Sequence, residues 1–120
     1  MTNDEFAAER RKQKRLEKLG TNDPRCGMCG EGDSRTLELH HVAGRKHDDT
    51  LVIVCGNCHR KVSDDQFDHP AFNANADIIL ASIGHFLLGL ADMLRIIVAK
   101  LYEFGKALIE RSSPNEGEMA

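Results

Sequence analysis

The sequence predicts an α+β protein with a small core, a basic helix before the core and a long apolar helix after it. Two Cys-x-x-Cys pairs, at residues 26–29 and 55–58, enclose two short segments with strand character. A stretch with helical spacing of leucine and isoleucine follows over residues 76–110. At 120 residues, the chain has room for one small domain with appendages.

The four cysteines have the spacing of a closed, tetrahedral structural zinc site. A redox role would account for one Cys-x-x-Cys pair but not for the second. The chain opens on charged and polar residues without the apolar segment of a signal peptide, so we expect a cytoplasmic protein. In a reducing compartment such pairs are typical of zinc ligands rather than disulfides. The expected ligands are Cys26, Cys29, Cys55 and Cys58.

Residues 1–22 are predicted to form a basic helical arm. A helix is expected over residues 4–19, with Thr2 and Glu5 as a capping box and Gly20 as its end. The net charge of the chain is −3, but a local basic patch can still bind phosphate. Two interpretations stay open: an arm that contacts phosphate, or a solvated helix with ion pairs at i,i+4 spacing. The basic residues concerned are Arg10, Arg11, Lys12, Lys14, Arg15 and Lys18.

Residues 23–70 are predicted to form the core, in the order cysteine pair, β-hairpin, cysteine pair, helix. Strands are expected over residues 36–42 and 51–54, and a short helix from the second pair to about Gln66. Because side chains alternate along a strand, His40 and His41 should point to opposite faces of the first strand. Adjacent histidines can therefore take different chemical roles.

Residues 71–111 are predicted to form the long apolar helix, and residues 112–120 a disordered tail. The helix should pack on the core or on other copies of the chain, so we expect a homo-oligomer. The uncharged run over residues 78–91 is shorter than the ~20 residues that a membrane span needs, and Asp92 and Arg95 follow it, which disfavours a membrane span. The apolar seam has unbroken 3,4 spacing and comprises Leu80, Ile83, Leu87, Leu90, Leu94, Ile97, Leu101, Phe104 and Leu108.

Part of the core resembles the HNH endonuclease family. The resemblance lies in Leu39-His40-His41-Val42, the Gly44-Arg45 loop, the segment 51–55 and Cys58-His59-Arg60, and it covers roughly residues 25–66. It implies a ββα-metal core of the treble-clef zinc-finger type. It also implies a metal-dependent endonuclease that hydrolyses phosphodiester bonds in nucleic acid, which we expect to be DNA.

The resemblance also implies roles for the three histidines. His41 would be the general base that activates water, a task that suits an imidazole with its ordinary pKa of about 6.5. His40 and His59 would hold a catalytic divalent metal, which the sequence does not fix among Mg²⁺, Mn²⁺ and other transition metals. The four cysteines would hold the structural Zn²⁺. Weaker candidates for contacts with nucleic-acid phosphates are Arg45, Arg60 and Lys61.

Thr50 departs from the family pattern, because the resemblance places an asparagine there that orients the base. Its hydroxyl can replace some of those hydrogen bonds, and Asp49 can supply a carboxylate. The departure leaves an alternative open: a catalytically weak or inactive zinc module that binds nucleic acid or protein. A third, weaker interpretation is a membrane-associated or effector protein that acts through its apolar helix. His47 is expected to be an exposed loop residue or phosphate contact, and His69 and His85 receive no role.

Overall fold

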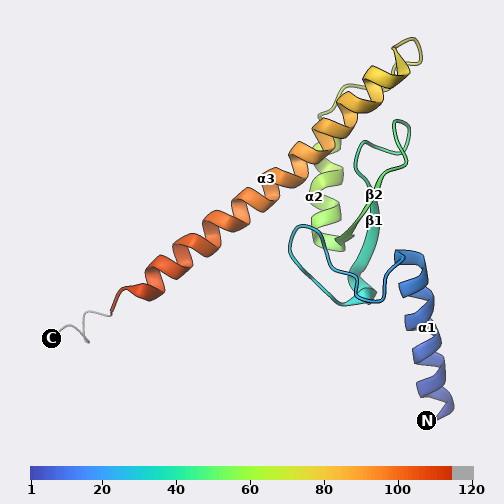
Figure 1. Cartoon of the computed structure of the whole chain (residues 1–120), viewed down its shortest axis with the longest axis vertical. Helices are drawn as coiled ribbons and strands as arrows, with labels where there is room; N and C mark the ends of the chain where they lie inside the picture. Colours follow the sequence, from blue (N-terminus) through green and yellow to red (C-terminus); the bar gives the residue numbers. More distant parts are fainter. Residues whose placement is uncertain (115–120) are drawn as a thin grey trace.

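The computed structural model describes residues 1–114 and has the predicted α+β class, with helices around one small sheet (Figure 1). The predicted disordered tail lies mostly outside the described residues, and Ser112 belongs to the last helix. In chain order the elements are α1 (Asn3–Leu19), the 3-10 turn η1 (Ser34–Thr36), β1 (Leu37–His41), β2 (Leu51–Cys55), α2 (Gly56–Gln66) and α3 (Ile78–Ser112).

Helix α1 begins one residue before the predicted start and ends at the predicted residue, Leu19. The side chain of Thr2 accepts a hydrogen bond from the backbone of Glu5, the Glu5 carboxylate accepts one in return, and Gly20 ends the helix at a φ of 79°. A left-handed φ favours glycine, which has no Cβ to clash. Leu16 is the buried residue of this helix. The rest of α1 is mostly exposed and projects from the core (Figure 1).

Strands β1 and β2 form a two-stranded antiparallel sheet, as predicted. His40 lies opposite Val52 and His41 opposite Leu51, so both histidines stand at the end of β1 next to the connecting loop. The amide of Val42 donates to the carbonyl of Thr50 at 3.1 Å and closes that loop. The Thr50 hydroxyl donates to the carboxylate of Asp48 at 2.5 Å, which lowers the pKa of Asp48. Thr50 therefore pins the loop through Asp48 rather than Asp49.

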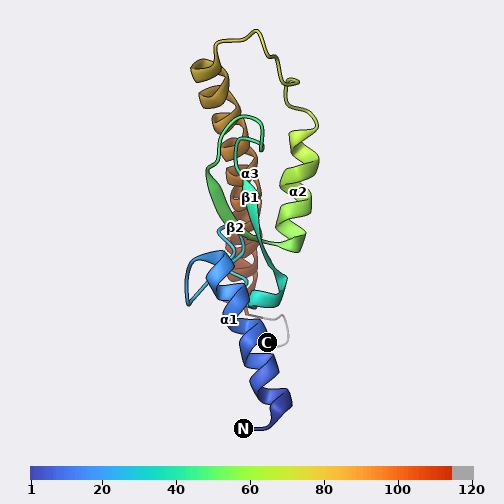
Figure 2. The same cartoon turned by 90° about the vertical axis from the view of Figure 1, so that its right-hand side faces the viewer.

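The core is small and lies between the hairpin, α2 and the first half of α3. Val54 of β2 and Val62 of α2 are its most completely buried large side chains. Figure 2 shows α2 and α3 running alongside the hairpin. The buried cysteines join this core, so the expected metal ligands and the apolar packing form one unit. The buried members are Cys26, Met28, Leu37, Val42, Val54, Cys55, Cys58, Val62 and Met93.

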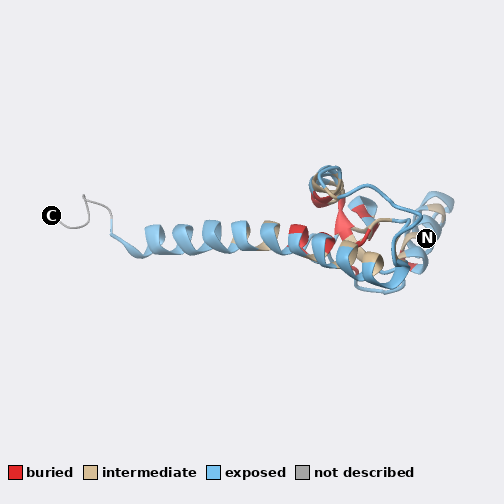
Figure 3. Cartoon of the chain, turned by 90° about the horizontal axis from the view of Figure 1, so that it is seen from above, coloured by how far each residue is buried: buried red, intermediate tan, exposed pale blue. Residues whose placement is uncertain are grey.

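Helix α3 approaches the core most closely at Gly89. A Cβ on Gly89 would lie 1.7 Å from the carbonyl oxygen of Val42, so the helix approaches the backbone directly after His41. Leu90 and Ile97 of the predicted apolar seam pack against this core, whereas Leu94 and Leu101 are exposed. The second half of the helix leaves the core and is exposed almost throughout (Figure 3).

The polar residues in the apolar first half of α3 face the core and find partners there. Ser82 donates to the carbonyl of His47 at 2.6 Å, and the buried Asp92 pairs with His69. Within the described part of the chain, α3 is the one helix long and apolar enough to cross a membrane by length and composition, and one such helix is weak evidence. The contacts of Ser82 and Asp92 favour docking on the core instead.

Substituting Gly89→Ala should lower the free energy of unfolding by about 1–3 kcal/mol, the cost of overpacking a fixed backbone contact. Gly105→Ala is the matched control, because a Cβ there meets no described atom within 4 Å. At protein concentrations where the chain is a monomer, it should raise stability by up to ~1 kcal/mol through helix propensity alone. Urea unfolding followed by circular dichroism measures both variants. Equal stability of the two would contradict the close approach of α3 to Val42.

Candidate metal centre and histidine site

Four thiols from two distant segments meet in one cluster. The sulfurs of Cys26, Cys29, Cys55 and Cys58 all lie within 4.8 Å of one another, and the Cys29 and Cys55 sulfurs are 3.6 Å apart. A disulfide needs about 2.05 Å, so all four are free cysteines. A tetrahedron with Zn–S bonds of ~2.3 Å puts its sulfurs roughly 3.8 Å apart. The cluster can hold one metal ion, and its ligand set fits zinc.

Backbone contacts bring the two cysteine pairs together. The amide of Gly27 donates to the carbonyl of Ile53 at 2.9 Å, which attaches the first pair to β2. Gly30 turns that segment back at a φ of 80°. Cys55 is the N-cap of α2, and its sulfur accepts a hydrogen bond from the amide of Cys58 at 3.4 Å. These contacts bring the two cysteine pairs side by side.

The thiols differ in how readily they lose their protons. Burial raises the pKa of Cys26, but backbone hydrogen bonds from Cys55, Met28 and Cys29 outweigh it and lower the pKa to about 7. Burial and the neighbouring thiols raise the pKa of Cys58. A cluster with one acidic thiol among less acidic ones would release protons when a metal binds, because only thiolates ligate zinc.

His40 is the least satisfied polar side chain of the core. It is 2% exposed, and its Nε2 atom has no hydrogen-bond partner among the described residues. Burial, together with the charges of His59 and His41, lowers the pKa of His40 to about 4, so the ring is neutral near pH 7. A buried, neutral imidazole nitrogen without a partner has a lone pair free for a ligand.

His59 on α2 lies directly beside His40. Their ring centroids are 5.2 Å apart and the rings meet edge to face at 68°. The Nδ1 atom of His59 donates to the carboxylate of Glu38, since a carboxylate can only accept. This bond fixes the tautomer of His59 and leaves its Nε2 available. Sequence reasoning assigned no role to Glu38, although its position two residues before His40 puts it on the same strand face.

His41 stands apart from that pair in its contacts. Its backbone carbonyl accepts a hydrogen bond from the side chain of Gln66 at 3.1 Å, while its own side chain makes no hydrogen bond within residues 1–114. The ring is half-buried. Gln66 also reaches the carbonyl of Val42 at 3.4 Å, so α2 and α3 together hold the backbone that carries His41.

The three candidate phosphate contacts do not lie in one place. Arg60 and Lys61 line a cavity of about 460 Å³ beside the thiol cluster and Glu38. Arg45 lines a different, more open cavity of about 610 Å³ beyond the end of β1. Arg60 also donates to Asn57 at 2.8 Å. The two cavities lie at opposite ends of the hairpin, so the three residues do not form one patch.

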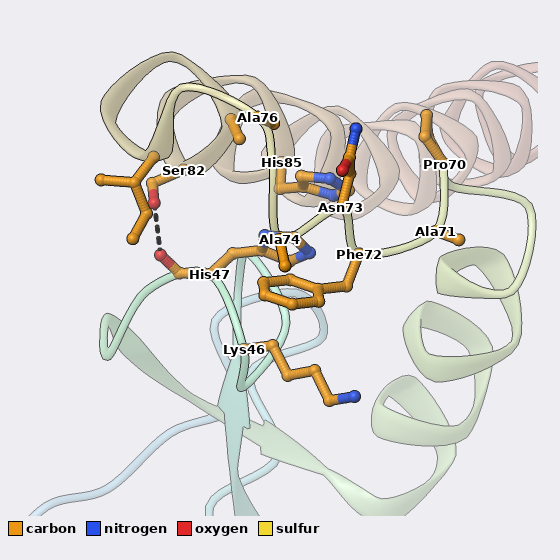
Figure 4. A pocket seen from close by; sticks show the side chains of 12 residues that line it. Lys46, His47, Pro70, Ala71, Phe72, Asn73, Ala74, Ala76, Ser82 and His85 are labelled. Atoms are coloured by element: carbon orange, nitrogen blue, oxygen red, sulfur yellow. Dashed lines mark hydrogen bonds between the residues drawn. The ribbon is translucent and has the colours of Figure 1, made fainter.

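The other three histidines form a second group that sequence reasoning did not predict. The rings of His47 and His85 stack with centroids 3.5 Å apart, and Phe72 lies against His47 (Figure 4). His69 donates from Nε2 to the buried Asp92 at 2.6 Å. These contacts join the loop after β1, the segment after α2 and the first half of α3, so their role is to dock α3. The sequence feature that could have indicated these contacts is Asp92, a single aspartate in an apolar stretch of helix.

No family model matches this chain, and neither do curated proteins or solved structures.

Removing the thiol-bound metal should unfold the core, because an apparent binding free energy of ~10–16 kcal/mol is available to folding from a structural zinc. We expect one zinc per chain by elemental analysis and a loss of cooperative unfolding after chelation or in Cys26→Ser. His40→Ala should keep one zinc per chain and serves as the control. A chelated chain with unchanged thermal stability would show that the cluster binds no structural metal.

Proposed function

We propose that this protein is a metal-dependent endonuclease of the HNH type that hydrolyses phosphodiester bonds in DNA. The observation that carries the proposal is the buried, unpartnered Nε2 of His40 next to His59, whose own Nδ1 is occupied by Glu38. A β-hairpin is followed by a helix, with one cysteine pair before the hairpin and the other at the start of the helix. This order supports a ββα-metal core of the treble-clef type.

His40 and His59 would hold the catalytic metal. Two imidazoles that share one ion at ~2.1 Å have ring centroids about 5 Å apart, close to the 5.2 Å between these rings. A divalent ion bound there would stabilise negative charge on the scissile phosphate and on the leaving oxygen. Two protein ligands leave the remaining positions open for substrate.

His41 would act as the general base. A water would lose a proton to the imidazole of His41 while its oxygen attacks phosphorus; the bond from phosphorus to the leaving oxygen would break, and that oxygen would take up a proton from solvent. The bond from Gln66 to the His41 carbonyl and the contact of Gly89 with Val42 hold this backbone still. Arg60 and Lys61, which line the same cavity as Glu38, would contact a phosphate of the nucleic acid.

The alternative function is a zinc module that binds nucleic acid or protein without cutting it. Thr50 motivates this alternative, because its hydroxyl is committed to Asp48 and is not free to orient His41. The neutral His40 beside His59 argues against it, since a module that only binds has no use for a buried nitrogen without a partner.

Replacing His41→Ala should reduce nicking of supercoiled plasmid by about 10²–10⁴-fold, the usual contribution of a general base. The assay compares wild type and variant with Mg²⁺ or Mn²⁺ and with chelator, at equal zinc content. His85→Ala is the control histidine, because no contact with substrate or metal is assigned to it, and its nicking rate should stay near that of wild type. If wild type binds DNA but never nicks it with any metal, the non-cutting module is the correct function, and Thr50→Asn becomes the next variant.

Replacing Glu38→Gln should weaken binding of the catalytic metal by about 10–100-fold, the usual effect of losing the carboxylate behind a ligating histidine. Co²⁺ titration followed by absorbance reports metal binding without any need for turnover. The exposed Glu31→Gln is a matched control. Unchanged Co²⁺ affinity in Glu38→Gln would remove Glu38 from the site.

A further inference from the structure

Helix α3 has a continuous apolar face that points away from its own core. Its residues follow alternating steps of four and three along the whole helix, which is the heptad spacing of paired helices. All nine are exposed. We call this face the outer strip; it consists of Leu80, Gly84, Leu87, Ala91, Leu94, Val98, Leu101, Gly105 and Leu108.

Large and small residues alternate along the outer strip. Each leucine is followed at the next position of the strip by a smaller residue, in the order glycine, alanine, valine, glycine. A Cβ on Gly84 or Gly105 meets no described atom within 4 Å, whereas Gly89 on the opposite face is filled by the backbone of Val42. The fold of one chain therefore uses Gly89 and leaves the small positions of the outer strip unfilled.

We propose that the outer strip pairs with the same strip of a second copy, with the two α3 helices antiparallel. One register then puts every leucine from 80 to 101 opposite a small residue: Leu80 meets Gly105 of the other copy, Leu101 meets Gly84, Leu87 meets Val98 and Leu94 meets Ala91. A parallel pair would place leucine on leucine and glycine on glycine, which leaves voids beside crowded layers.

The exposed area is large enough for a dimer. The five leucines and Val98 are 49–70% exposed, which leaves on the order of 700 Å² for each copy, close to the ~800 Å² per partner of a standard interface. From Leu101 to Ser112, every residue of α3 is exposed in the described part of the chain (Figure 3). In the antiparallel pair, it would lie along the first half of the other α3.

A second copy fits this face better than a lipid bilayer does. A bilayer surrounds a helix on all sides, but Ser82 and Asp92 are bonded to the core on the inner side, and Lys106 and Glu110 are charged in the second half. Core-bonded and charged residues thus interrupt the apolar surface along one side of the helix. The alternation of leucines and smaller residues along the outer strip is complementary to the same strip in antiparallel orientation. This favours a second copy of the chain as the partner over a different protein.

This inference does not depend on the nuclease proposal. The cores would lie on opposite sides of the helix pair, because each contacts the face of α3 that carries Gly89. Each copy would keep its own His40, His41 and His59. His41→Ala should therefore dimerise as wild type does, so a failure of one proposal leaves the other standing.

Sedimentation equilibrium of the full, zinc-loaded chain tests the pairing. Wild type should form a dimer, and Gly105→Leu should raise its dissociation constant by at least about tenfold, since two overpacked layers per dimer lose their fit. Gly105→Leu improves helix propensity, so the single chain stays folded. Ala107→Leu adds a leucine on the inner face of the same turn and should leave the constant unchanged. A wild-type monomer, or equal effects of both variants, overturns the proposal.

Photocrosslinking determines the direction of the helices. A benzophenone side chain at position 87 should crosslink near Val98 of the other copy in an antiparallel pair, whereas crosslinks near position 87 itself would overturn that direction. Flotation with vesicles of phosphatidylcholine and phosphatidylglycerol tests whether the outer strip binds a lipid membrane instead. Wild type that floats with vesicles and is monomeric without them would overturn the dimer and make the outer strip a membrane contact.

Discussion

The rest of the structure depends on the meeting of four thiols from segments nearly thirty residues apart in the chain. Without them, a two-stranded sheet and a short helix would have to bury enough apolar surface by themselves, and a sheet of two strands is marginal in water. The cluster fixes the first cysteine pair against β2 and the start of α2 against the hairpin. The positions of the two histidines follow from that cluster, because His59 directly follows Cys58 and His40 pairs across the sheet with Val52, close to Cys55.

Local features of the fold could be predicted from sequence because their causes are local. The capping box of α1, the left-handed Gly20, the hairpin and the start of α2 each follow from a few neighbouring residues, and the structure confirms them. The gathering of the four cysteines was also predicted, since zinc spacing is a strong signal. The partnership of Glu38 with His59 was missed, because it joins residues 21 positions apart.

Contacts between distant segments account for the other misses. Asp92 looked like a charge that interrupts an apolar helix, and its use is visible only once His69 lies next to it. The predicted seam of α3 treated one helix face as a unit, but Leu90 and Ile97 pack on the core while the leucines beside them stay exposed. A periodic pattern of apolar residues predicts which face of a helix is apolar. It does not predict whether the core of the same chain or another chain covers that face. The roles of the histidines in catalysis stay a prediction.

The long unsupported helices give this chain an unusual shape for its mass. The radius of gyration is 19.9 Å, whereas a compact chain of this length has about 14 Å. A molecule of that shape meets more friction than a sphere of equal mass and diffuses more slowly. On a gel-filtration column calibrated with globular standards, a single copy would elute early and pass for a larger assembly. Subunit counts for this protein must therefore come from mass itself, by sedimentation or light scattering, and not from elution volume.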